Sequence, residues 1–336
     1  MTDMVVARPV LEGARAQGGL GGAAFEGFVR AGQTIEMKAF TGVTGDAGGF
    51  AVPREIDQVI ETALKAASPI RAIANVVKVG TAGYRKLVTT GGTPSGWAAE
   101  TQARPETATP AFTEIAPPMG ELYANPSASQ AMLDDAGFDV EEWLANEIAM
   151  EFAKAEGAAF VNGSGVNRPK GFLTYPTAAT ADAGRPFGTL QHLASGAAAD
   201  FGPNPQDRLI DLVQSLRAPY RQGACFVMNA ATVARVRKVK TADGAFVWQP
   251  SLSAGQPATL LGYPVVEAED MPDVAANACP IAFGNFRRGY LVAERAETAI
   301  LRDPYSNKPF VGFYATKRVG GAVVNSEAIK LLRIGA

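Results

Sequence analysis

The chain contains one histidine, His192, among its 336 residues. Imidazole serves most general acid–base sites and many zinc sites, so catalysis here would have to rest on other groups. Ser164 and Ser195 have glycine neighbours, but neither lies in the spacing of a nucleophile elbow. With His192 alone, a Ser-His-Asp arrangement has weak support. The sequence therefore predicts a surface or packing role for His192 and no catalytic residue.

Acidic pairs and cysteines supply the other groups that could react. The pairs at 134–135 and 141–142 stand beside predicted helix ends, which is typical of helix-terminal acids rather than of acid/base pairs. Cys225 and Cys279 lie far apart and match no metal-ligand spacing. We expect them to be thiols of a reducing compartment rather than a disulfide, and we predict no metal site.

Two glycine-rich stretches and one basic run could bind phosphate. Residues 19–24 match a relaxed dinucleotide fingerprint, but no strand precedes them. Residues 162–171 resemble a phosphate loop loosely, and they follow a helix rather than a strand. These patterns indicate a flexible arm and a tight helix-capping loop, so no cofactor is predicted. The basic run at 235–240 fits either a solvated helix face or a contact with a subunit or phosphate.

Composition excludes several classes of protein. The chain is 47% hydrophobic, and its formal net charge of −2 lacks the basic excess of a dedicated nucleic-acid binder. No apolar run reaches the length of a membrane span, and the N-terminus lacks the pattern of a signal peptide. The 36 glycines and 22 prolines indicate many turns and extended loops.

The first third of the chain predicts extensions from a folded body. Residues 1–50 are interrupted by glycines and predict an arm, and a helix from Pro53 should end before Pro69. A strand is predicted at 73–79. The stretch 80–110 has little hydrophobic periodicity, and its alternation favours a long two-stranded ribbon. Because an isolated ribbon is only marginally stable, it should lie on another surface, such as another subunit.

The rest of the chain mixes helices and strands without strict alternation. The strongest helix is predicted at 139–161, with Asp139 as its N-cap. Trp97 and Trp248 are expected in exposed loops. Further helices are predicted from Pro205 and at 232–240. Strands are predicted at 113–116, 120–124, 224–228, 261–268, 280–283, 289–292, 298–301, 311–318 and 322–325. This order favours an α+β fold over a doubly wound sheet.

Five separate segments carry a resemblance to a known family. They occur in the family's order at 48–71, 94–115, 160–173, 226–273 and 281–332. Together they resemble the major capsid proteins of tailed bacteriophages, which have the Hong Kong 97 fold, and the resemblance extends to gene-transfer-agent capsid proteins. It covers about 38–332. The resemblance implies a non-enzymatic shell protein without cofactors.

The resemblance also implies how the chain is divided. The expected parts are an N-terminal arm at 1–50, a peripheral domain beginning at 51–79, an extended β-hairpin loop at 80–110, more of the peripheral domain at 111–189 with a spine helix at 139–161, an axial domain at 190–285, and the C-terminal part of the peripheral domain at 286–336. The C-terminal strands should rejoin the peripheral sheet.

The implied working surface is a set of contacts between subunits. The candidates are Arg85, Lys86, Trp97, Glu100, Arg104, Glu106, Arg168 and Lys170. The implied partners are copies of the chain in hexamers and pentamers, a portal protein, and possible scaffold, maturation-protease and decoration proteins. The shell would enclose packaged double-stranded DNA without sequence-specific contact. It would form a virion capsid, assembled in the host bacterial cytoplasm away from any membrane.

One family feature is not expected here. The crosslinking member joins subunits through a Lys–Asn isopeptide bond assisted by a Glu, and Lys86 lies in the loop that carries the donor. If Arg318 corresponds to a strand arginine of that member, the positions of its crosslinking Asn and assisting Glu are occupied here by Pro309 and Thr316. We therefore predict no autocatalytic crosslink. The remaining alternatives are an encapsulin-type compartment and, on the glycine motifs alone, a nucleotide-dependent enzyme. The sequence does not distinguish a phage capsid from a gene-transfer-agent capsid.

Overall fold

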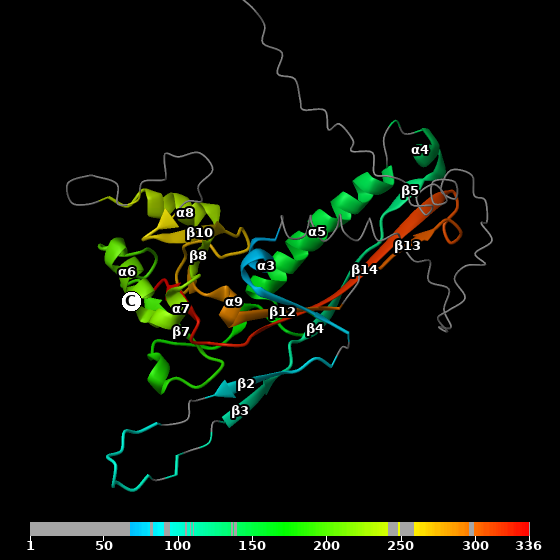
Figure 1. Ribbon diagram of the computed structural model, residues 1–336. Helices are drawn as coiled ribbons and strands as arrows, with labels where there is room; N and C mark the ends of the chain where they lie inside the picture. Colours follow the sequence, from blue (N-terminus) through cyan, green and yellow to red (C-terminus); the bar gives the residue numbers. More distant parts are fainter. Residues whose placement is uncertain are drawn as a thin grey trace, which may run out of the picture.

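A computed structural model describes most of the chain from Ser68 onward (Figure 1). The described residues are 68–80, 83–90, 95–104, 106–107, 109, 111–135, 137, 140–240, 248, 259–295 and 299–335. The predicted arm, the helix from Pro53, the glycines at 19–24 and the Asp139 cap lie outside them. The structure combines helices with two large sheets and a separate pair of strands, in agreement with the α+β prediction.

The first large sheet has six strands and carries the long helix. Its strands are β1 (Asn75–Val79), β4 (Met119–Ala124), β5 (Ser127–Ser129), β12 (Tyr290–Arg295), β13 (Ala299–Asp303) and β14 (Phe310–Val323). Strand β14 pairs with β12, β13, β4 and β5, so it is the centre of the sheet. Two short helices border it, α3 (Pro69–Ile73) and α4 (Gln130–Asp135).

Helix α5 (Val140–Asn162) lies along this sheet (Figure 1). Buried residues recur on one face of α5 at helical spacing, including Ile148, Phe152 and Ala153, and they pack against Ala315 of β14. The sequence predicted this helix at 139–161. The agreement follows from a run of strong helix formers with a continuous buried stripe.

The second large sheet has seven strands. In spatial order they are β6 (Thr177–Ala178), β7 (Leu190–Ala194), β15 (Ile329–Arg333), β11 (Ile281–Gly284), β8 (Cys225–Met228), β10 (Tyr263–Glu267) and β9 (Thr259–Leu260). The helices of this region are α6 (Pro205–Ser215), α7 (Ala218–Arg221), α8 (Ala230–Arg237) and α9 (Phe286–Gly289), with short 3-10 turns η1 (Phe172–Thr174) and η2 (Asp182–Gly184). Its core includes Leu212, Phe226 and Phe283.

The two sheets share a core where α5 ends. Tyr290, which begins β12, packs edge-on against Phe160 of α5 and Phe172 of η1. The Tyr290 hydroxyl donates to the backbone oxygen of Lys170 at 2.9 Å, and its ring is fully buried. This cluster continues to Ile329 of β15. The lobes of the molecule are therefore joined by packed side chains.

Three sequence expectations need correction. The strands predicted at 311–318 and 322–325 are one strand, β14, which ends at Val323, because Gly320 and Gly321 pair with Ala293 and Val292 of β12. The last strand, β15, does not rejoin the six-stranded sheet with the other C-terminal strands; it pairs with β11 and β7. Trp248 is buried rather than exposed, and Arg237 stacks on its ring at 5.0 Å.

Candidate subunit interface

The ribbon was predicted at 80–110, but its second paired strand lies outside that range, at 111–115, and the paired strands expose apolar side chains. Strand β2 (Lys86–Thr90) pairs antiparallel with β3 (Ala111–Ile115), and together they project from the body (Figure 1). Leu87 lies opposite Glu114 and Thr89 lies opposite Phe112, which puts Leu87 and Phe112 on one face. Their exposed fractions are 69% and 67%. Two strands bury too little apolar surface to be stable alone, so the ribbon has little stabilisation of its own.

The charged candidates on the ribbon are solvent-exposed. Arg85 contacts both oxygens of Glu114 at 3.2 Å, and both side chains are exposed, so the pair adds little stability. Lys86 lies on the opposite face, across from Ile115. Beyond the paired strands, the candidates Trp97, Glu100, Arg104 and Glu106 are all exposed, and Trp97 is as exposed as in a free chain.

The loop after α5 is tightly folded. Ser164 bridges to Lys170, Gly165 has a φ of 80° and Asn167 has a φ of 53°. Lys170 is held within its own chain, because its backbone N–H donates to Gly321 at 3.0 Å and its ammonium lies over the Tyr175 ring at 4.2 Å. Of the two loop candidates, Arg168 is exposed to solvent and Lys170 is half-buried.

The loop and the ribbon meet at strand β4. The chain runs from β3 directly into β4, and a side-chain carbon on Gly120 would collide with the backbone of Asn167 and Arg168. The next residue, Glu121, accepts from Arg318 of β14 at 2.9 Å. The structure therefore groups the eight candidates into a ribbon set and a loop set whose bases adjoin.

Sequence reasoning missed an exposed apolar face on the six-stranded sheet. Tyr123 is 69% exposed, and it lies opposite Thr316 in the β4–β14 register. Leu301 and Tyr314 lie opposite one another on the same face and are 41% and 39% exposed. The alternation of β14 between buried and exposed residues was the available signal. We call Tyr123, Leu301 and Tyr314 the outer sheet face.

The other missed feature is a buried set of four charges beneath α5. Arg71 of α3 contacts Glu156 of α5 at 3.2 Å and also pairs with Glu294 of β12. Lys317 of β14 contacts Glu156 at 2.6 Å. All four are at most 5% exposed. Burial lowers the pKa of Lys317, although the Glu156 carboxylate acts in the opposite direction. This cluster joins α3, α5, β12 and β14.

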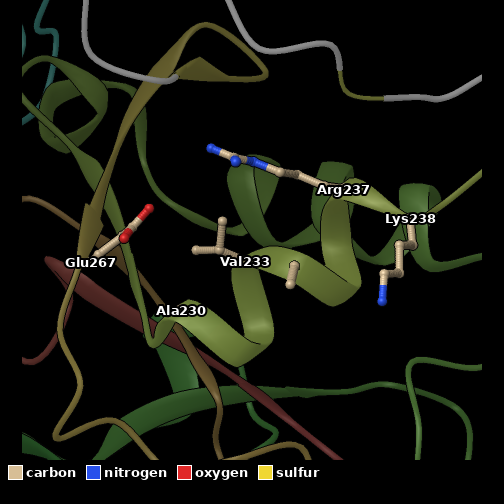
Figure 2. A pocket seen from close by; sticks show the side chains of 6 residues that line it. Ala230, Val233, Arg237, Lys238 and Glu267 are labelled. Atoms are coloured by element: carbon tan, nitrogen blue, oxygen red, sulfur yellow. The ribbon is translucent and has the colours of Figure 1, made fainter. Parts of the chain in front are cut away.

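Two pockets lie among the described residues. One pocket, with a volume of about 460 Å³, lies between α8 and β10. Figure 2 shows Arg237 and Lys238 at the end of α8 and Glu267 across from them. This pocket is lined by no nucleophile with an adjacent base. A second pocket of about 240 Å³ lies beside Glu156 and Arg168. Within the described residues, no group of three His, Cys, Asp or Glu side chains is arranged to hold a metal ion.

The remaining predicted residues occupy ordinary structural positions. His192 is half-buried on β7 opposite Leu331, and its Nδ1 is buried without a hydrogen bond. Cys225 is buried, Cys279 is half-buried, and both are free thiols. Among the described helices, none is long and apolar enough to span a bilayer.

Comparison with known proteins identifies the family to which the chain belongs. A sequence model of the phage capsid family matches residues 48–334, so the chain belongs to the phage capsid family. The capsid of an empty GTA particle is 47% identical, with a TM-score of 0.75 over 88% of this chain and 96% of that one. The capsid of a native GTA particle is 48% identical, with a TM-score of 0.74 over 90% and 98%. No curated protein matches.

More distant solved structures share the fold. The structure from Microbacterium phage Oxtober96 is 13% identical, with a TM-score of 0.59 over 86% of this chain and 95% of that one. The chain is thus a major capsid protein with the fold of phage capsids. It assembles with copies of itself into the capsomers of an icosahedral particle shell, and its role is structural rather than enzymatic.

Proposed function

We propose that the chain forms pentamers and hexamers in a shell that encloses double-stranded DNA, and that the particle is a gene transfer agent rather than a phage. The support for the second part is the contrast in identity: 47–48% with two GTA capsids and 11–14% with the phage structures. The identity of 47–48% to GTA capsids is itself the reason to prefer a GTA shell to an encapsulin-type compartment. The DNA would be held without sequence-specific contact.

The wider setting follows from the same proposal. A portal protein would occupy one vertex, and a scaffold, maturation protease or decoration proteins would act during or after assembly in the host bacterial cytoplasm. We assign α5 as the spine helix of a peripheral domain built on the six-stranded sheet. The seven-stranded sheet would form the axial domain at the capsomer centre, including β15 from the end of the chain.

The exposed apolar side chains of the ribbon are the observation that supports assembly through the ribbon. Leu87, Phe112 and Trp97 are large apolar side chains that the described chain leaves in solvent, on a ribbon too small to be stable alone. Burying them on a neighbouring subunit removes this exposed apolar surface from water and orders the ribbon. The charged candidates Arg85, Lys86, Glu100, Arg104, Glu106, Arg168 and Lys170 would form the polar rim, with Lys170 held mainly by its own chain.

The outer sheet face is the surface on the neighbour that best suits this ribbon. It offers Tyr123, Leu301 and Tyr314 beside the Arg318–Glu121 pair, and the ribbon offers Leu87 and Phe112 beside the Arg85–Glu114 pair. Apolar side chains would meet in the centre, with charges of both signs at the edge.

Assembly of the purified chain tests the proposal by negative-stain microscopy and size exclusion. The double variant L87S/F112S should fold like the wild type and yield far fewer shells. The matched control is I210S, which changes an apolar residue of α6 that is 44% exposed; it should assemble normally. Wild-type chain that stays monomeric under all assembly conditions would contradict the shell, and normal assembly of L87S/F112S would contradict the ribbon contact.

A further inference from the structure

Helices α7 and α9 lie next to one another (Figure 1). Four arginines belong to these two helices or adjoin them. Arg217 precedes α7, Arg221 is its last residue, and Arg287 and Arg288 lie on α9. The two helices are fixed to one another, because Asn285 donates to the backbone oxygen of Gln222 at 2.7 Å. We call these four residues the α7–α9 arginine surface.

Backbone carbonyls hold two of these guanidinium groups in place. Arg221 donates from Nε to the Leu216 oxygen at 2.8 Å and from a terminal nitrogen to the Gln214 oxygen at 3.0 Å. Arg288 donates to the Pro219 oxygen at 3.2 Å. A carbonyl positions a guanidinium group but does not neutralise its charge. These cations are therefore preorganised and keep their full positive charge.

The surroundings of the arginine surface do not supply the missing negative charge. Arg217 approaches Glu327 at 3.4 Å and Asp182 at 3.5 Å, but Asp182 is already paired with Arg185 and Lys330. Exposed Arg287 has no hydrogen bond or ion pair with any residue that the structure describes. The described ion pairs of the arginine surface therefore involve Arg217 alone, whereas Arg221 and Arg288 contact only backbone oxygens.

We propose that the α7–α9 arginine surface contacts the phosphate backbone of duplex DNA inside the shell. The inference rests on the proposed enclosure of DNA and adds the residues that touch it. Guanidinium groups with free N–H donors match phosphate oxygens, and such contacts carry no sequence information. Few contacts per subunit give weak individual binding, which still lets the DNA slide while many subunits share it.

Nucleic acid fits this surface better than a second subunit does. Protein interfaces have an apolar core, whereas protein–DNA interfaces are more polar and more positive. Among the described residues, none of the large apolar side chains that are exposed lies on α7 or α9. The exposed apolar side chains on the ribbon and the outer sheet face lie on other elements.

The test measures the affinity of the unassembled chain for a short random-sequence DNA duplex at a series of NaCl concentrations, by fluorescence anisotropy. The variant is R287A/R288A. The matched control is R208A/R235A, which removes two exposed arginines that have carboxylate partners, Asp211 at 3.5 Å and Asp200 at 3.8 Å. Both variants are also assembled and examined by negative stain, and their thermal unfolding is compared with the wild type.

The expected result is salt-dependent binding whose log–log slope is smaller by about 2 in R287A/R288A, because each arginine that neutralises a phosphate adds about 0.9 to the slope. The control should keep nearly the wild-type slope, and both variants should form shells. An unchanged slope in R287A/R288A with normal shells overturns the inference and leaves the shell proposal intact. Failed assembly with an unchanged slope also overturns it and assigns the surface to a second copy. A wild type that forms no shells contradicts the proposed function instead.

Discussion

Because Lys317 belongs to the buried four-charge cluster, we predict that removing its charge strongly destabilises the fold. Its ammonium is 2.6 Å from Glu156 and 3.9 Å from Glu294, at a place where each side chain is at most 6% exposed. The substitution K317M keeps the volume and removes the charge. It leaves two buried carboxylates facing Arg71 alone. Breaking a buried pair by removing one partner costs about 3–5 kcal/mol, and we expect that loss in the free energy of unfolding.

The neighbouring residue supplies a matched control. Arg318 follows Lys317 on β14 but points to the opposite face, where its pair with Glu121 is about half exposed. Because exposed pairs contribute about 0–1 kcal/mol, R318M should change the free energy of unfolding by less than about 1 kcal/mol. Urea unfolding of the unassembled chain, followed by circular dichroism, measures both variants under the same conditions.

A second variant separates charge from packing. The double substitution K317M/E156L leaves Arg71 with Glu294, so the remaining buried charge is balanced. Apolar replacement of a buried pair is often neutral or stabilising, so the double variant should recover most of the stability that K317M removes. The reasoning is refuted if K317M unfolds within about 1 kcal/mol of R318M, or if the double variant is no more stable than K317M.

Three further outcomes are expected. Burial and the charge of Arg333 lower the pKa of His192, so stability should fall as pH drops through the unfolded-state value of about 6.5; H192Q should flatten that part of the pH–Tm profile. Burial raises the pKa of Cys225 to about 12, so a thiol reagent at neutral pH should modify Cys225 only after unfolding. Denaturing gels of particles should show no ladder of covalent oligomers through Lys86.

The sequence predicts elements whose signal is local. The long run at 140–162 repeats good helix formers and a buried stripe, and the helix was placed within one residue at each end. The split at Gly320 and Gly321 was wrong because tertiary pairing on both sides of β14 overrides the turn preference of glycine. Strands β7 and β15 were missed; they pair with one another, although they lie far apart in the chain.

The candidate interface divides in the same way. The exposure of Trp97, Glu100, Arg104 and Glu106 could be predicted because their stretch of the sequence lacks core periodicity, whereas Phe112 lay outside the predicted ribbon. Lys170 was a weaker choice, because no spacing in the sequence shows that its ammonium packs on Tyr175. The charge cluster could not be predicted either. Lys317 and Arg318 are adjacent basic residues, and only the side of β14 on which α5 lies makes one buried and the other exposed.

The position of the charge cluster explains how a slender ribbon can be aimed at a neighbour. One leg of the ribbon continues from β1 and the other leads into β4, and these strands pair with β12 and β14 respectively. Glu294 and Lys317 lie on β12 and β14, so the cluster joins the two strands that hold β1 and β4 in the sheet. Removing a charge from the cluster should therefore make the orientation of the ribbon less well defined under conditions in which the chain is still folded. At temperatures where K317M is still folded, we expect it to assemble into fewer closed shells than R318M, and equal yields would contradict this link.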